Sequence, residues 1–220
     1  MAARYAVPRV QAAGGDMHAQ VEEIPPRKSL NAGRRASVLT YEDLNLQVKL
    51  PGRQEKRILH GISGDASSGE LLAIMGPSGS GKTTLLQALA GRPTGRLEGK
   101  LSIDGKRPSK NTRRKTALVP QHDIMWEALT VKESLEYAAL LRLPEDMDRH
   151  EKLKRCREVA EELGIDKCYN TVVGGITRPG ISGGEKKRLS IAIELISRPT
   201  LLILDVSLFL HLDALSNSQC

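Results

Sequence analysis

Eight consecutive residues in the first half of the sequence have the types and spacing needed to hold a polyphosphate. They follow the pattern G-x-x-x-x-G-K-[ST], in which glycines let the backbone approach phosphate oxygens closely and the backbone amides act as donors. The pattern follows an apolar run and precedes a segment of helix-forming residues, which is the context that it requires. An ordinary Gly/Ser-rich turn is the alternative that this context argues against. The eight residues are Gly76, Pro77, Ser78, Gly79, Ser80, Gly81, Lys82 and Thr83.

This segment is a phosphate-binding loop, or P-loop, and its last two residues carry the charge chemistry. We expect Lys82 to contact the β- and γ-phosphates of ATP, and the Thr83 hydroxyl to hold Mg²⁺. Asp205 ends a second apolar run and fits the other carboxylate that organises Mg²⁺ in such sites. An Asp at a strand end is also common in turns, but its place after a P-loop favours the metal role.

A second glycine-containing segment, Ser182-Gly183-Gly184-Glu185, opens a later helix. It is a Ser-x-x-Glu capping box, which satisfies the free amide groups of a helix start. It could equally form a second phosphate-binding helix N-terminus, because its small residues allow close approach. These four residues alone do not decide between the two interpretations.

The elements that must position these residues are strands and helices of an α/β fold. An apolar run over residues 71–75 predicts a strand buried on both faces, as in a parallel sheet. A helix over 82–90 with Gly91 as its stop should follow the P-loop. A short strand pair over 39–41 and 44–50, and a strand over 101–103 that enters a turn at Asp104-Gly105, complete this half.

The second half of the sequence reads as mainly helical. Thr130 and Glu133 form a capping box at the start of one helix, and apolar residues at helical spacing predict two more over 148–163 and 182–197. A last apolar strand covers 201–205. This order predicts an α/β core with an inserted helical subdomain at about residues 122–181.

Composition is that of a soluble globular chain. Of its 220 residues, 40% are hydrophobic and 27% charged, and no run approaches the 18 apolar residues of a membrane-spanning helix. Its three cysteines show neither metal-ligand spacing nor a disulfide framework, which favours a reducing setting. Residues 1–37 show no sustained periodicity, and we expect a disordered arm there.

Positive charge is concentrated between Arg92 and Lys115, a stretch with nine basic residues and only two acidic ones, Glu98 and Asp104. Contact with nucleic acid or an anionic lipid surface would suit such a stretch. No aromatic residue is interleaved to stack on bases, so a solvated loop is the favoured interpretation and nucleic acid is not an expected partner.

Together these segments resemble the ATP-binding domain of ABC transporters. Residues 76–84, which end at Thr84, match the family's Walker A motif, Gln121 its Q-loop, residues 181–185 its signature motif, and residues 201–205 its Walker B motif. The four occur in the family's order over residues 38–205. The run after the signature and residues 129–133 resemble the White/ABCG subfamily in particular.

This resemblance implies a P-loop NTPase core that binds ATP and Mg²⁺, the metal being held by Thr83, Gln121 and Asp205. It implies a second ABC ATPase domain as partner, with each ATP lying between the Walker A motif of one domain and the signature motif of the other. The signature residues Ser182, Gly183, Gly184 and Glu185 would then face the partner's ATP. The resemblance also implies transport driven at the cytosolic face of a membrane.

The sequence departs from the family pattern after Asp205. Val206 stands where the family places the glutamate that polarises the attacking water, and residues 206–220 form an atypical tail. We therefore expect no intact catalytic base, and Gln121 would serve only to orient water. The family's switch histidine, later strands and membrane domain are not found, so the fold should be incomplete at its C-terminus and the chain a fragment. A natural tail and a gene-model artefact both stay open.

One further departure from the family pattern and two alternative functions follow from the sequence. Leu46 stands where many relatives place an aromatic residue that stacks on adenine, which leaves Tyr41 as a strand residue. A non-transport ABC ATPase is one alternative, although a second copy of the domain would then be expected. A binding-only or dominant-interfering fragment that pairs with intact subunits is the other.

Overall fold

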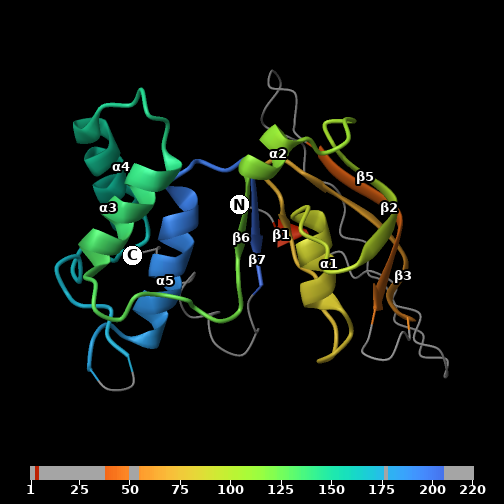
Figure 1. The fold of residues 1–220 in the computed structure, drawn as a ribbon, viewed down its shortest axis with the longest axis horizontal. Helices are drawn as coiled ribbons and strands as arrows, with labels where there is room; N and C mark the ends of the chain where they lie inside the picture. Colours follow the sequence, from red (N-terminus) through yellow and green to blue (C-terminus); the bar gives the residue numbers. More distant parts are fainter. Residues whose placement is uncertain (1–2, 5–37, 50–54, 176–177, 206–220) are drawn as a thin grey trace. The chain divides into compact units, whose positions relative to one another are not determined.

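A computed structural model describes residues 3–4, 38–49, 55–175 and 178–205. The chain divides into two compact units, residues 1–113 and 114–220, and both contain strands and helices (Figure 1). The tail 206–220, including Val206, lies outside the described residues. So does the arm predicted over residues 1–37, except for the short strand β1 (Ala3–Arg4).

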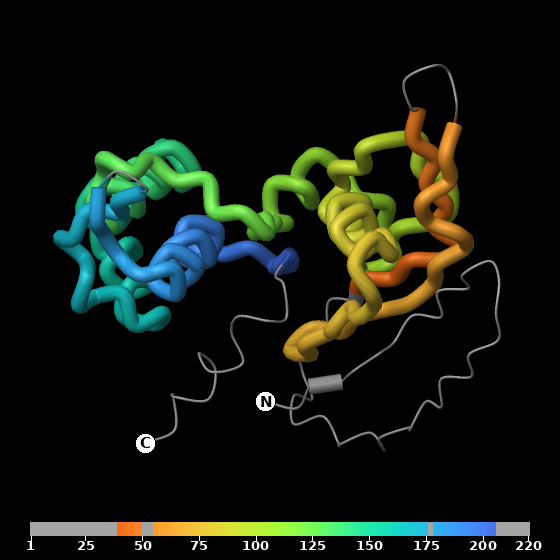
Figure 2. The backbone as a smooth tube through the Cα atoms, turned by 90° about the horizontal axis from the view of Figure 1, so that it is seen from below, coloured from red at the N-terminus to blue at the C-terminus, as the bar shows by residue number. Residues whose placement is uncertain are grey.

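The first unit contains a three-stranded antiparallel sheet. Its central strand β2 (Val38–Lys49) pairs with β3 (Glu55–Ser67) on one side and with β5 (Arg96–Ile103) on the other. Figure 2 shows the adjacent courses of β2 and β3. The strand β3 was not predicted, because glycine, histidine and charged residues interrupt its apolar pattern.

The prediction of two short strands over 39–41 and 44–50 was wrong, because β2 is a single strand with an irregularity. Asp43 has a left-handed φ of 48°, and the pairing register shifts between Tyr41 and Leu44. The Asn45 amide donates to the Asp43 carbonyl at 2.9 Å, and the Gly61 amide donates to Asn45 at 2.9 Å. These bonds hold the bulge within the sheet, so the chain need not turn there.

The prediction of a buried strand over residues 71–75 was also wrong. Only β4 (Leu71–Leu72) is a strand, and its recorded pair is the two-residue β1. Leu71 and Met75 are exposed. A strand is buried on both faces only where neighbours cover it, and two paired residues cannot supply that cover.

The predicted turn at Asp104-Gly105 is confirmed. Both residues have positive φ, 54° and 71°, as a two-residue hairpin turn that matches strand twist requires. Ile103 and Lys106 exchange backbone hydrogen bonds of 2.9 and 3.1 Å across it. The short helix α2 (Lys110–Arg114) follows.

The described part of the second unit contains three helices and a pair of parallel strands. The helices are α3 (Val131–Arg142), α4 (Arg149–Glu162) and α5 (Gly183–Leu195), close to the predicted bounds. Strand β6 (Thr116–Val119) pairs in parallel with β7 (Leu201–Leu204), where Ile203 is buried and the rest half-buried. Helices α3 and α4 fall within the predicted inserted subdomain over 122–181, whereas α5 lies beyond it. The boundaries of that subdomain stay a prediction.

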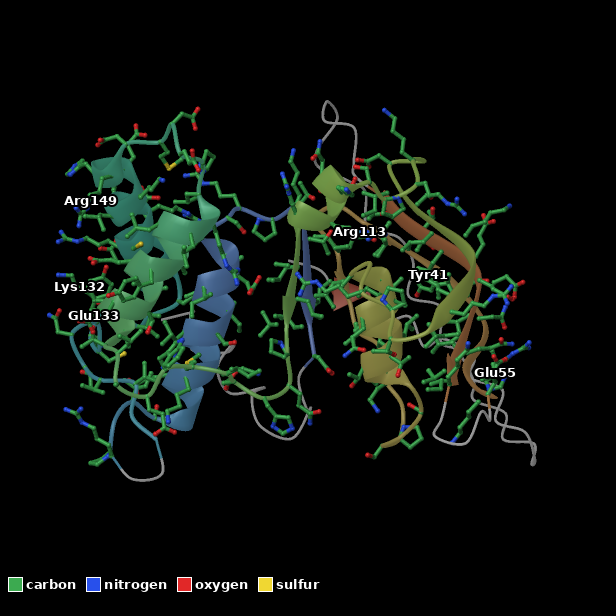
Figure 3. All side chains as sticks on the ribbon, viewed as in Figure 1. Tyr41, Glu55, Arg113, Lys132, Glu133 and Arg149 are labelled. Atoms are coloured by element: carbon green, nitrogen blue, oxygen red, sulfur yellow. The ribbon has the colours of Figure 1, made fainter. Side chains whose placement is uncertain are left out.

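The capping box predicted at Thr130 is present. The Glu133 carboxylate accepts from the Thr130 amide and hydroxyl, each at 2.8 Å, and the Glu133 amide donates to the Thr130 hydroxyl at 3.2 Å. Figure 3 labels Glu133 at the start of α3, beside Lys132. These bonds satisfy amide groups that the helix cannot pair internally.

We expect Thr130→Ala to destabilise the chain by about 1 kcal/mol, the usual effect of losing a hydroxyl N-cap. Urea unfolding followed by circular dichroism measures this. Thr171→Ala is the matched control, since Thr171 is an exposed threonine beside the same helix start. Equal loss of stability in both variants would contradict the capping role.

The cap also predicts a pH dependence. Hydrogen bonds from the Thr130 amide, and then from its hydroxyl, lower the pKa of Glu133 from 4.5. A carboxyl with a lowered pKa stabilises the fold above its unfolded pKa, and this stabilisation is lost as the pH falls through the folded pKa. Wild type should therefore exceed Glu133→Gln in stability at pH 6, and the gap should close below pH 4.5. Urea midpoints at both pH values test this, and a constant gap would contradict it.

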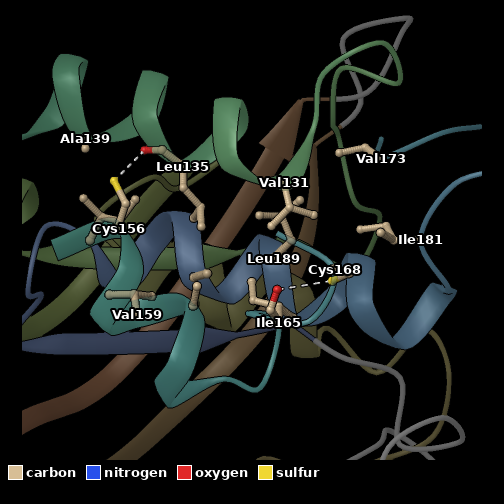
Figure 4. Packing of buried hydrophobic residues seen from close by; sticks show 13 residues of the cluster. Val131, Leu135, Ala139, Cys156, Val159, Ile165, Cys168, Val173, Ile181 and Leu189 are labelled. Atoms are coloured by element: carbon tan, nitrogen blue, oxygen red, sulfur yellow. Dashed lines mark hydrogen bonds between the residues drawn. The ribbon is translucent and has the colours of Figure 1, made fainter. Parts of the chain in front are cut away.

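The helices of the second unit enclose one apolar cluster (Figure 4). Cys156 and Cys168 are part of it, with thiols that donate to the Leu135 and Ile165 carbonyls at 3.4 and 3.3 Å. Burial raises the pKa of Cys156 to about 11, so this thiol is protonated and inert at neutral pH. Both of these cysteines are free, while Cys220 lies outside the described residues. The cluster comprises Val131, Leu135, Ala139, Cys156, Val159, Ala160, Ile165, Cys168, Val173, Ile181, Leu189, Ala192 and Ile196.

Candidate nucleotide-binding site

The P-loop lies in the first unit, directly before helix α1 (Lys82–Leu89). Gly79 and Gly81 have φ of 80° and 91°, in the region that residues with a side chain rarely adopt. A Cβ on Gly76 would lie 2.9 Å from the Ser80 hydroxyl. The backbone conformation therefore favours glycine at Gly79 and Gly81, whereas a side chain at Gly76 would need the Ser80 side chain to move.

The loop leads into a helix start without a side-chain cap. Gly81 is the N-cap residue, and the first turn of α1 contains no acidic residue. Leu85, Ala88 and Leu89 are buried and fix the helix against the first unit. The amide groups of the first turn thus present donors and a partial positive charge, which is the arrangement that binds phosphate.

Lys82 bends back over the loop. Its ammonium group donates to the carbonyls of Gly76 and Pro77, at 2.8 and 2.7 Å. The charge is thereby held above the glycine-rich backbone, where a bound phosphate chain would lie. Thr83, expected to hold Mg²⁺, is exposed at the start of α1, and Thr84 follows it half-buried.

Leu46, at the position where relatives place an adenine-stacking aromatic residue, and Tyr41 are both buried. Leu46 is fully buried and Tyr41 is only 3% exposed. A Cβ on Gly64 would collide with the Tyr41 ring, so the phenol packs against that glycine. Burial, and next the Asp65 carboxylate, raise the pKa of Tyr41. The interpretation of Tyr41 as a strand residue is confirmed.

In the second unit, Gln121 and Asp205 follow the two parallel strands at the same end of the pair. Val119 is paired in register with Leu204, and the Asp205 amide donates to the Val119 carbonyl at 2.9 Å. Gln121 follows Val119 by two residues and Asp205 directly follows Leu204, so both candidate ligands lie at the carboxyl edge that the parallel strands share. Gln121 and Asp205 are 84 positions apart in the sequence, and the strand pairing brings them to one edge.

The signature segment forms the N-terminus of α5 as a capping box. The Glu185 carboxylate accepts from the Ser182 amide at 2.7 Å and from its hydroxyl at 2.8 Å. These bonds lower the pKa of Glu185, the amide more than the hydroxyl. A Cβ on Gly183 would meet no atom within 4 Å, so the space beside this glycine is open. The interpretation of this segment as a helix-capping box is thus confirmed. Its binding of a phosphate group stays a prediction.

Sequence reasoning missed Lys187, which joins this helix to the Gln121 loop. Its ammonium group donates to the carbonyls of Pro120 and Gln121, at 2.9 and 3.2 Å, and to the Asp123 carboxylate at 3.0 Å. Lys187 lies in the run after the signature motif, which resembles the White/ABCG subfamily. No local signal could have paired it with a loop more than 60 positions away.

The basic stretch over residues 92–115 is partly paired with acidic side chains. Arg96 contacts Glu98 at 3.0 Å and Lys100 contacts Glu42 at 3.3 Å, all four on the surface. Such exposed pairs contribute little to stability and suit a solvated surface.

The described ranges contain neither a cluster of metal ligands nor a membrane-spanning helix. Within residues 3–4, 38–49, 55–175 and 178–205, no group of three or more His, Cys, Asp or Glu could hold a metal ion. In the same part of the chain, every helix is too short or too polar to cross a membrane.

Comparison with known proteins identifies relatives for most of the chain. Residues 59–207 match the family described as ABC transporter. The chain is 43% identical to "ABC transporter G family member 21" of Arabidopsis thaliana over 203 residues, which cover 87% of this chain and 30% of that protein. It is 47% identical to "ABC transporter G family member 22" and 50% identical to "ABC transporter G family member 25" of the same plant, over 76% and 69% of this chain. The chain spans between 23% and 30% of the length of these three relatives.

Proposed function

The chain belongs to the ABC transporter family and carries an ATP-binding domain of the G type, and on this premise we propose that it binds Mg-ATP to drive movement of a substrate across a membrane. The observation that carries the proposal is the P-loop itself. Its positive-φ glycines, uncapped helix start and overhanging Lys82 ammonium form one phosphate cradle.

Binding would proceed by an exchange of partners at Lys82. The ammonium group now donates to two loop carbonyls, and phosphate oxygens offer it stronger, charge-assisted bonds in the same place. Amides of the loop and of the first turn of α1 would donate to the remaining oxygens. The residues proposed to hold ATP are Gly76, Pro77, Ser78, Gly79, Ser80, Gly81, Lys82, Thr83, Thr84 and Gln121.

Mg²⁺, when bound, would neutralise phosphate charge. The Thr83 hydroxyl, the Asp205 carboxylate and the Gln121 amide oxygen are the proposed ligands, and oxygen donors are what Mg²⁺ prefers. Gln121 would also orient a water molecule. The common strand edge of Gln121 and Asp205 supports this assignment.

We propose a second ABC ATPase domain as the partner, in a homodimer or heterodimer at the cytosolic face of a membrane. Ser182, Gly183 and Gly184 would approach the γ-phosphate of the partner's ATP, with Glu185 holding Ser182 in place. The open space beside Gly183 and the α5 N-terminus support this role.

A second candidate function is binding without turnover, in which the chain pairs with intact subunits and interferes with them. The observation that favours this function is Val206, an apolar residue at the position where the family has a catalytic glutamate. Valine can neither accept a proton nor orient water.

Titration of the 220-residue chain with a fluorescent ATP analogue tests the proposed site. We expect saturable binding that requires Mg²⁺ and is displaced by ATP and by tripolyphosphate better than by adenosine, because the built part of the site is a phosphate cradle. Binding that adenosine displaces as well as tripolyphosphate, or no saturable binding, would reject it.

A further inference from the structure

The Lys187 ammonium group donates to three acceptors that all lie in one short loop. An ammonium group has three N–H donors. The three acceptors at 2.9, 3.2 and 3.0 Å come from Pro120, Gln121 and Asp123, which span four positions of the chain. A surface lysine that merely covers apolar groups would not need such matched partners.

The contact lies largely out of water. The Lys187 side chain is 14% exposed and the Asp123 side chain 21% exposed. At such burial a charge pair is only weakly screened by salt, and removing one partner leaves the other desolvated and unpaired. The attachment is therefore firm.

The neighbouring lysine makes a different attachment and provides an internal comparison. Lys186 donates to the Gly174 carbonyl at 2.9 Å, in the loop that precedes α5. Lys186 thus ties α5 to the segment before it, whereas Lys187 ties α5 to the segment that carries Gln121.

We propose that Lys187 is a positioning residue that fixes the Gln121 loop to the signature helix. On the proposed function, on which this inference rests, Gln121 serves the chain's own nucleotide and Ser182 serves the partner domain's nucleotide. Lys187 therefore makes the two contacts move together, and a nucleotide at one site biases the other. Coupling of this kind is reciprocal, because each ligand acts on the same linked element.

The sequence supplies a reporter for the loop. Trp126 is the only tryptophan of the chain, lies three positions after Asp123, and is exposed. Its fluorescence anisotropy, together with amide order parameters of residues 121–126 from NMR relaxation, reports the mobility of the loop alone.

The first experiment compares Lys187→Met with Lys186→Met in the full chain without nucleotide. Lys187→Met should lower Trp126 anisotropy and take loop order parameters from about 0.85 toward 0.6, the range between rigid and flexible backbone. Lys186→Met should leave both unchanged, and Lys187→Arg, which keeps charge and donors, should restore most of the order. Wild-type values in Lys187→Met, or equal loosening in both methionine variants, would overturn the proposal.

A second variant decides the question if Lys187→Met does not fold. Asp123→Ala removes one acceptor and leaves Lys187 its two carbonyls, so it should loosen the loop in the same direction by a smaller amount. An unchanged loop in Asp123→Ala would then overturn the proposal.

The second experiment adds Mg-ATP and follows the amide signals of residues 183–186. In wild type these signals should shift together with those of residues 121–126. In Lys187→Met the Gln121 loop should respond while residues 183–186 do not. Identical shifts in both proteins would overturn the coupling. If wild type binds no Mg-ATP, the proposed function fails, and the nucleotide-free experiment still judges Lys187.

Discussion

Lys82→Ala should weaken Mg-ATP binding by roughly 1.5–3 kcal/mol, the range of a hydrogen bond to a charged group, or about 10- to 160-fold in Kd. The ammonium group is the only cation of the P-loop, and it already lies over the glycine-rich backbone through the Gly76 and Pro77 carbonyls. Removing it leaves the amide donors of α1 in place, so binding should weaken without disappearing.

Titration of the fluorescent ATP analogue measures this loss. Lys106→Ala is the matched control, since Lys106 is an exposed lysine of the same unit outside the P-loop. Thermal unfolding of both variants separates a lost contact from a disrupted loop. Equal affinities of Lys82→Ala and wild type would reject the assignment of the P-loop.

Hydrolysis should be nearly absent in a chain that nevertheless binds Mg-ATP. Loss of a positioned base typically lowers a rate by about 10²–10⁴-fold, and Val206 offers no base. Val206 lies outside the described residues, so this prediction comes from its place directly after Asp205 in the sequence.

Phosphate release at saturating Mg-ATP tests the prediction, with Lys82→Ala as the background. The two proteins should differ in affinity and agree in their low rate of hydrolysis. A wild-type rate well above that of Lys82→Ala would show that another group activates water, and would reject the binding-only function.

Features encoded within a few consecutive residues were predictable from the sequence. The P-loop, the capping boxes at Thr130 and Ser182, the turn at Asp104-Gly105 and helices α1, α3, α4 and α5 all have the expected places. Each depends on backbone hydrogen bonds, φ preferences or apolar spacing that neighbouring residues supply by themselves.

Only the tertiary structure decided which segments lie side by side. It made one bulged strand of residues 38–49, added β3, left residues 71–75 mostly outside a sheet, and buried Leu46 and Tyr41. It also joined Lys187 to a loop 67 positions away and set Asp205 beside Val119. Such contacts depend on strand pairing and packing between distant segments, for which no short stretch of sequence carries a signal.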